Sequence, residues 1–241
     1  MRHGSAYAVI VNDVAYLVDF GPGVIRRAAE MSPAWGGNIP QLQVKKLQYA
    51  FLTHLHSDHS GGLADLILTP WVMGRDSELK LFGPKGLKLM SDSILDAYEL
   101  DILYRLNGTQ PANPIGFKTI VKEIEEGIIF KDENIEVISF YNDHGDFKDS
   151  FGYVFKTKDK KILFSGDTSL SINLKKHGDD LDILVHEVYS SEGFKTKTDD
   201  WKIYHREHHT SSVELGIIAN DLKPKKLVAS HILFWGASEE S

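Results

Sequence analysis

The sequence predicts an α/β protein in which two mixed sheets are covered by helices. Two β-hairpins are expected, at residues 6–19 and 151–166, because in each of them two β-rich runs flank a two-residue turn. Other short apolar strands alternate with helical stretches later in the chain. Hairpins followed by alternating strands and helices are typical of sheets flanked by helices. No internal repeat or linker interrupts the pattern, so a single domain over 1–241 is expected.

The first half of the chain opens with the amino-terminal hairpin, whose strands are predicted at 6–11 and 14–19. Gly21-Pro22-Gly23 then ends the second strand, and helical spacing follows at 24–31. Further elements are expected in this order: a strand at 47–53, a helix at 63–68, a strand at 79–82 and one long helix over 86–106.

The second half begins after a Pro- and Gly-containing connector at 109–118. A β-meander is predicted over 121–124, 128–131 and 135–141, and the second hairpin pairs 151–158 with 161–166. A strand at 181–186, a helix at 210–222 and a strand at 225–231 complete the expected order of elements.

Composition limits the chemistry that the chain can perform. The 241 residues are 42% hydrophobic, which suits a folded domain, and the net charge of -7 gives no general attraction to nucleic acid. There are no cysteines, so any metal must be held by His, Asp or Glu. No apolar run approaches the roughly 18 to 20 residues that span a bilayer, and no signal peptide is evident, so a cytoplasmic location without a membrane partner is expected.

The most informative segment is His54-Leu55-His56-Ser57-Asp58-His59, which directly follows a predicted strand. His54 and His56 are two residues apart on extended backbone, so their side chains project to the same side and can share one metal ion. Asp58 and His59 lie beyond the turn and can point toward a second ion. The segment therefore predicts a metal site at the end of a strand.

This segment resembles the HxHxDH signature of the metallo-β-lactamase superfamily, and the resemblance extends over nearly the whole chain. It implies an αββα sandwich with a two-metal site. Three further ligands are implied by position: His144 after a strand, Asp167 at the end of a hairpin and His231 at the end of a late strand. By this resemblance His54, His56 and His144 hold one metal, Asp58, His59 and His231 hold the other, and Asp167 bridges them. Asp19 matches an aspartate that supports the ligands through hydrogen bonds.

The resemblance implies a hydrolase that uses a metal-bridging hydroxide as its nucleophile, with two zinc ions as the expected cofactors and manganese or iron as alternatives. Two histidines, His186 and His209, are not assigned to metal. The segments around them resemble the ribonuclease Z and arylsulfatase-like branch, which implies that Glu187 orients His209 and that His209 protonates the leaving oxygen. Asp58 is expected to be a catalytic residue as well as a metal ligand.

The expected substrate is a small phosphoric or sulfuric ester, with aryl esters as one option, and the expected assembly is a homodimer. Five aromatic residues are candidates for an apolar mouth, although each can equally be packed in the core: Trp71, Trp201, Tyr204, Phe234 and Trp235. The resemblance also leads us to expect that the family's Gly-rich opening strand and closing helix are absent, because the family's edges are trimmed or the chain is truncated.

Two alternatives remain inside the enzyme class. One is a ribonuclease Z-type endonuclease of tRNA 3′ ends, which is not favoured because the chain is acidic and lacks a basic, Gly-rich arm. The other is a hydrolase of a carbonyl centre, such as a β-lactamase or lactonase. A flavin-associated reductase would need a glutamate where His56 stands, and a non-catalytic binding protein is disfavoured because no ligand residue is lost.

Overall fold

The computed structural model describes residues 4–238. The chain divides into two compact units, Met1–Ile124 and Glu125–Ser241, each of which is described below by itself. Among the described residues, no helix is long and apolar enough to cross a membrane. The expectation of one domain over 1–241 stays a prediction.

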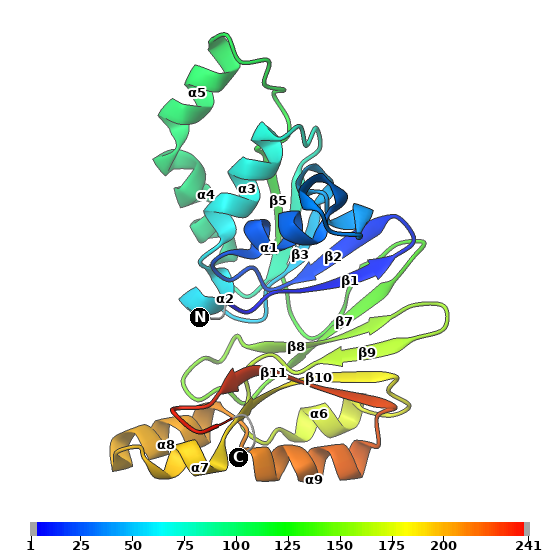
Figure 1. Ribbon diagram of the computed structural model, residues 1–241, viewed down its shortest axis with the longest axis vertical. Coiled ribbons are helices and arrows are strands. Elements are labelled where there is room, and N and C mark those ends of the chain that lie inside the picture. The colour runs from blue at the N-terminus through cyan, green and yellow to red at the C-terminus, as the bar shows by residue number, and fades with distance from the viewer. Residues whose placement is uncertain (1–3, 239–241) are drawn as a thin grey trace. The chain divides into compact units, whose positions relative to one another are not determined.

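The amino-terminal unit is built on a five-stranded sheet with the order β1-β2-β3-β4-β5 (Figure 1). β1 and β2 pair antiparallel as the predicted hairpin, and the other neighbours pair parallel. The strands are β1 Tyr7–Val11, β2 Val14–Val18, β3 Tyr49–Phe51, β4 Leu79–Gly83 and β5 Thr119–Glu123. The helices are α1 Val24–Met31, α2 Ser57–Ser60, α3 Leu63–Val72, α4 Leu87–Ala97 and α5 Glu99–Asn107, with single 3₁₀ turns η1 Pro33–Trp35, η2 Pro40–Leu42 and η3 Val44–Lys46.

The core of this unit forms between the sheet and helices α1, α3 and α4. Leu17, Leu52 and Leu81 of the sheet region are buried together with Ile25 of α1 and Leu66 of α3. These apolar side chains bring the end of β3 close to the end of β2, where Phe51 O accepts a hydrogen bond from Asp19 N at 2.8 Å. The packing thus fixes the backbone from which the His54–His59 segment leaves the sheet.

The carboxy-terminal unit is built on a six-stranded sheet with the order β11-β10-β9-β8-β7-β6. β6 to β9 pair antiparallel, including the predicted hairpin of β8 and β9, whereas β9, β10 and β11 are parallel. The strands are β6 Gly127–Lys131, β7 Glu136–Tyr141, β8 Phe151–Lys156, β9 Lys161–Phe164, β10 Ile183–Tyr189 and β11 Lys226–Leu233. The helices are α6 Ile172–His177, α7 Ser191–Lys195, α8 Asp199–His208 and α9 Ser212–Leu222.

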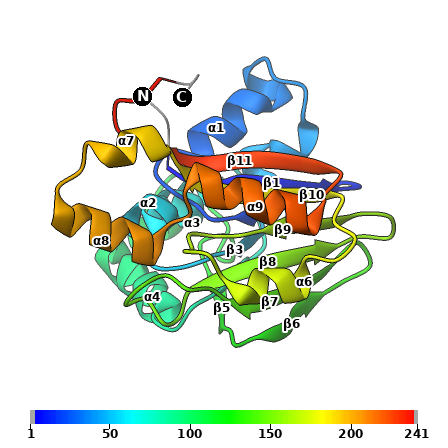
Figure 2. The same ribbon diagram turned by 90° about the horizontal axis from the view of Figure 1, so that it is seen from below.

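Helices α6 and α9 cover one face of this second sheet (Figure 2). Leu174 of α6 and Ile218 of α9 pack on Val154, Leu163 and Leu184 of the strands. α9 begins with a capping box, in which Ser211 and Glu214 each satisfy the other's backbone N–H. This cap fixes the backbone just after His209, the residue predicted to donate a proton.

Two predictions of local structure are wrong. The helix expected over 86–106 is two helices separated by Tyr98, whose φ of -102° and ψ of 12° lie outside the α-helical range. β5 belongs to the first sheet, where it pairs parallel with β4, so it is not part of a meander with β6 and β7. α8 was not predicted, since the residues it buries are histidines rather than an apolar stripe.

Trp71 does not line an apolar mouth. Its side chain is buried in the amino-terminal unit, packs on Phe117 and donates a hydrogen bond from Nε1 to Asn113 O at 2.8 Å. Nearby Arg75 is fully buried, and its guanidinium donates to four backbone carbonyls, those of Leu47, Leu66, Ile67 and Gly116. This segment therefore stabilises the fold.

Candidate metal centre

The His54–His59 segment forms a compact cluster of side chains at the end of β3. The backbone stays extended through His56, which is the N-cap of the short helix α2, and the helical turn then presents Asp58 and His59. Nε2 of His54 lies 2.9 Å from Nδ1 of His56, and the rings of His54 and His59 are 4.2 Å apart. Three imidazoles thus converge within one loop, as metal ligands do.

Asp19 anchors this cluster from the end of β2. Its Oδ2 accepts a hydrogen bond from Nδ1 of His59 at 2.7 Å, and its Oδ1 accepts from N of Thr53 at 2.8 Å. Oγ1 of Thr53 donates to the same carboxylate and lies 3.0 Å from Nδ1 of His54. Both imidazoles are therefore held through Nδ1, directly or through Thr53, which leaves Nε2 of each as the donor atom. The expected supporting role of Asp19 agrees with these contacts.

His144 lies in the carboxy-terminal unit, in the loop that follows β7. Its Nδ1 donates to the carbonyl oxygen of His208 at 2.8 Å, so its Nε2 is the atom available to a metal. Gly145 has φ of 55°, and a Cβ there would lie 2.1 Å from the ring of His208. Only glycine therefore fits against the ring of His208 at position 145, and the placement of the neighbouring His144 depends on this fit.

Asp167 and His231 come together in the same unit. Asp167 follows β9 and is buried, and its Oδ2 lies 3.5 Å from Nε2 of His231. In the pairing of β10 with β11, Ser230 and Ile232 oppose consecutive residues, so His231 is the extra residue of a β-bulge. Its φ of 42° is left-handed, and a bulge of this kind redirects the side chain out of the strand's regular alternation. Asp167, His209 and His231 each offer one donor atom within 4.8 Å of the others.

Glu187 and His209 form a buried pair beside Asp167. Oε1 of Glu187 accepts hydrogen bonds from Nδ1 of His209 at 3.1 Å, from N of Thr168 at 3.0 Å and from N of Thr210 at 3.2 Å. Burial, and next the negative charge of Asp167, raise the pKa of Glu187 well above its usual value. Since His209 is held through Nδ1, its Nε2 is the atom that can hold or release a proton.

His186 is excluded as a proton donor. It precedes Glu187 on β10, its side chain is fully buried, and its Nδ1 donates to the carbonyl oxygen of Glu187 at 2.7 Å. Burial lowers the pKa of His186 to about 4, so the ring is neutral at physiological pH.

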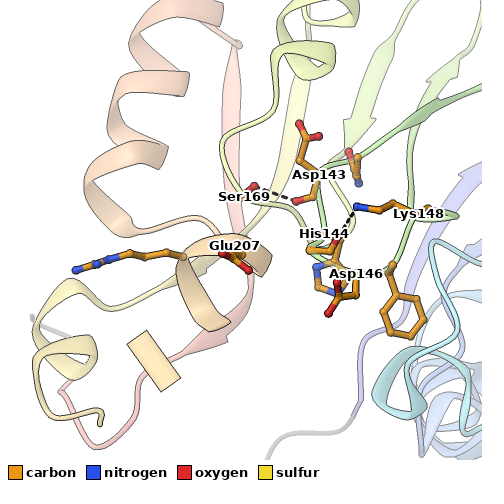
Figure 3. A pocket seen from close by; sticks show the side chains of 10 residues that line it. Asp143, His144, Asp146, Lys148, Ser169 and Glu207 are labelled. Carbon is orange, nitrogen blue, oxygen red and sulfur yellow. Dashed lines mark hydrogen bonds between the residues drawn. The ribbon is translucent and has the colours of Figure 1, made fainter. Parts of the chain in front are cut away.

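A cavity of about 520 Å³ opens beside His144 (Figure 3). It is lined by the loop 142–148 with Ser169, Arg206 and Glu207. Lys148 and Ser169 stabilise the wall, because Nζ of Lys148 donates to Gly145 O at 3.0 Å and Oγ of Ser169 donates to Asp143 O at 3.0 Å. The role of the His208 carbonyl as an anchor for His144 was not predictable, since a backbone carbonyl has no residue-type signal.

The donor set fits a divalent metal. Imidazoles held through their other nitrogen, together with buried carboxylates and no thiolate, suit Zn²⁺, Mn²⁺ or Fe²⁺. Donors of this kind and the carboxylate-held imidazole of His209 are the groups that a metal-dependent hydrolase requires.

The chain belongs to the metallo-β-lactamase superfamily, whose family model matches residues 1–231. The predicted fold, two mixed sheets flanked by helices, is thereby confirmed. The chain is a metal-dependent hydrolase that acts on ester bonds, and its similarity to ribonucleases Z supports the ribonuclease Z branch of the superfamily.

Those relatives include ribonuclease Z of Bacillus subtilis, which is 24% identical with 79% of this chain and 72% of the relative covered. Ribonuclease Z of Mycolicibacterium gilvum is 29% identical, and the match covers 78% of this chain and 63% of the relative. Among solved structures, the short form of human tRNase Z superposes with a TM-score of 0.70 at 23% identity and covers 95% of this chain and 86% of that one. The metallo-β-lactamase fold protein YhfI of Bacillus subtilis superposes with a TM-score of 0.66 at 17% identity, and the match covers 98% of this chain and 81% of that one.

Proposed function

We propose that this chain is an endoribonuclease of the ribonuclease Z type, which cleaves a phosphodiester bond at the 3′ end of transfer RNA precursors. The similarity to curated ribonucleases Z supports this substrate over the small aryl ester that the sequence favoured. The acidic net charge argued against RNA, but net charge describes the whole chain and not the surface around one site.

The observation that carries the proposal is the buried pair of Glu187 and His209. A phenolate leaves a phosphate without much help from an acid, whereas a ribose oxygen is a poor leaving group and has to be protonated as its bond to phosphorus breaks. A dedicated, carboxylate-held imidazole is therefore better matched to RNA than to an aryl ester.

We propose that seven residues hold two divalent ions, with zinc as the first candidate and manganese or iron as alternatives. They are His54, His56, Asp58, His59, His144, Asp167 and His231. When bound, such ions polarise the phosphate and lower the pKa of water to about 7. Asp58 belongs to this set and, besides binding metal, is proposed to accept a hydrogen bond from the attacking water.

In this scheme the proton for the leaving oxygen comes from Nε2 of His209. The Glu187 carboxylate accepts a hydrogen bond from Nδ1–H of the same ring, which fixes the ring's orientation and stabilises its cationic form. Backbone N–H groups of Thr168 and Thr210 hold the carboxylate in place, so it cannot turn away from the imidazole.

The test compares four substrates under one set of conditions: a transfer RNA precursor with a 3′ trailer, an aryl phosphodiester, an aryl sulfate and a β-lactam. Each is assayed after loading with zinc or manganese and again with a chelator. The expected result is chelator-sensitive cleavage of the precursor at a single position next to the trailer. Turnover of the sulfate or the β-lactam without cleavage of RNA would contradict the proposal, and the corresponding small-ester or carbonyl hydrolase would replace it.

A further inference from the structure

A row of aromatic rings leads along α8 to His209. Trp201, His205 and His209 are spaced by four residues, so they lie on one side of the helix and its C-cap. The rings of Trp201 and His205 are stacked, with centroids 5.4 Å apart and an interplanar angle of 22°. The rings of His205 and His209 follow at 5.6 Å. The row therefore connects the surface to the proposed proton donor.

The outer end of this row is open to solvent. Trp201 is 54% exposed, although it is the largest apolar side chain of α8. The inner neighbour, His205, is buried, and its second aromatic contact is Trp235, at 4.2 Å between ring centroids. Burial is the main cause that lowers the pKa of His205 to about 4, so a neutral ring supports the inner side of Trp201. An exposed tryptophan that is held flat from behind is a stacking surface.

Two cations lie near the row. Lys197 places Nζ 4.6 Å from the ring centroid of Trp235, and the exposed Arg206 lies over the ring of Phe194. In the part of the chain that the structure describes, neither cation has a carboxylate within ion-pair distance. α8 also carries Asp199, Asp200 and Glu207, so this surface is not uniformly basic and stacking is its dominant feature.

We propose that Trp201 is a stacking subsite for a nucleobase of single-stranded RNA, on the leaving-group side of the bond that is cut. The inference rests on the proposed function and names the part of the RNA that this surface receives. Trp201 and His209 are ~12 Å apart along the helix axis, from eight residues at 1.5 Å each. That distance suits the base of a nucleotide near the reacting phosphate better than the reacting nucleotide itself. Lys197 and Arg206 are placed to neutralise the flanking phosphates.

A nucleobase suits this surface better than a protein side chain. Successive bases present flat π faces at regular intervals, and stacking on an aromatic ring tolerates any base. A processing enzyme that accepts many precursors needs contacts of this sequence-tolerant kind. The mixed charge of α8 also predicts a shallow dependence of affinity on salt, since few phosphates are neutralised.

The experiment measures the affinity of single-stranded RNA by fluorescence anisotropy in the presence of a chelator, so that no cleavage is needed for the readout. Trp201→Ala is expected to weaken binding about 5- to 100-fold, and Trp201→Phe is expected to restore most of the loss. Trp35→Ala is the matched control, because Trp35 is also an exposed tryptophan, at 68%, but lies in η1 of the other unit. It is expected to bind as the wild type does.

A set of RNAs that each lack one base near the cut site then tests the pairing of ring and base. At one position, loss of the base should weaken RNA binding by the wild type. The affinity of Trp201→Ala for the same abasic RNA should stay within about twofold of its affinity for the intact RNA. The inference would be overturned if the wild type and Trp201→Ala bound intact RNA with equal affinity. It would also be overturned if Trp201→Ala bound every abasic RNA more weakly than the wild type does, by the same factor as intact RNA. If RNA is cleaved normally in either case, the proposed function stands while this inference fails; absence of any cleavage by the metal-loaded wild type would instead refute the proposed function.

Discussion

Single side chains in this protein are positioned by a repeated device, in which one nitrogen of a histidine is fixed so that the other is free to act. Asp19 fixes His59, the carbonyl of His208 fixes His144, and Glu187 fixes His209. A buried imidazole without such an anchor can rotate or change tautomer, and then loses its role as ligand or acid. Loss of one anchor is therefore expected to impair function without unfolding the chain.

Replacement of His209 tests this device at the proton donor. His209→Ala is expected to lower kcat about 10²- to 10⁴-fold on RNA, because the leaving ribose oxygen loses its acid, while metal content stays at the wild-type level. Glu187→Gln should give a smaller loss, since the amide still accepts a hydrogen bond but stabilises the cationic ring less.

The measurement is kcat over a series of phosphodiesters whose leaving groups differ in pKa. The plot of log kcat against leaving-group pKa should be steeper for His209→Ala than for the wild type. The same slope in both proteins would exclude His209 as the acid.

At the scale of helices and strands, the loops that carry the chemistry follow from contacts far apart in the sequence. The local His54–His59 motif was readable because its ligands are consecutive, and His144, Asp167 and His231 were readable only as histidines or aspartates at strand ends. The bulge that redirects His231 was not predictable, since it depends on how β10 and β11 pair. Whether Trp71 lies in the core or at a cavity mouth was not predictable, because a large aromatic residue has the same sequence signal in both places.

Arg75 illustrates an element-scale contact that sequence patterns do not reveal. It ties α3 to segments before β3 and before β5 through hydrogen bonds to the carbonyl oxygens of Leu66, Leu47 and Gly116. Arg75→Met is expected to lower the free energy of unfolding by about 3 kcal/mol or more, because several buried acceptors lose their partner.

Urea unfolding measures this effect, with Arg27→Met as the control. Arg27 is half exposed and pairs with Glu30 on the surface of α1, where such a pair contributes at most about 1 kcal/mol. Equal losses in the two variants would show that the buried guanidinium does not hold these segments together.

Asp182 stabilises the connection between β9 and β10. It accepts hydrogen bonds from N of Lys161 and from Nζ of Lys225, each at 2.9 Å, and these contacts lower the pKa of Asp182 from 3.8 to about 2. The folded state thus holds the proton less tightly than the unfolded state does. Stability from this group is complete above about pH 4 and is lost as the pH falls toward 2.

Asp182→Asn should therefore be less stable than the wild type at pH 7, and the difference should shrink between pH 4 and pH 2. Denaturant midpoints recorded across that range provide the measurement. A difference that is constant with pH would mean that the carboxylate charge contributes nothing.

At the scale of the whole molecule, the chain divides into two compact units, each built on one sheet. The motif predicted the family fold, with its two mixed sheets. The division into units and the assignment of β5 to the first sheet were not predictable, because they depend on long-range strand pairing. The expected homodimer also stays a prediction.

Metal removal is the corresponding test. A ligand at 100 times its dissociation constant stabilises a fold by about 2.7 kcal/mol, so chelation is expected to lower Tm by about 5 to 10 °C as well as to abolish hydrolysis. Added zinc or manganese should restore both properties. Full activity after the metal content has been shown to be zero would rule out the proposed centre.

The helix α8 places an exposed tryptophan in its first turn and a buried histidine at its far end. Residues at the buried end are constrained by Glu187, Thr210 and the capping box that follows. The residue at position 201 is more than half exposed, and its ring contacts are with His205 and Tyr204 of the same helix. Mutations can accumulate at position 201 without harm to the fold or the chemistry. In a lineage that duplicates this gene, a change of substrate would therefore be expected to begin at that outer turn, long before the reaction itself altered.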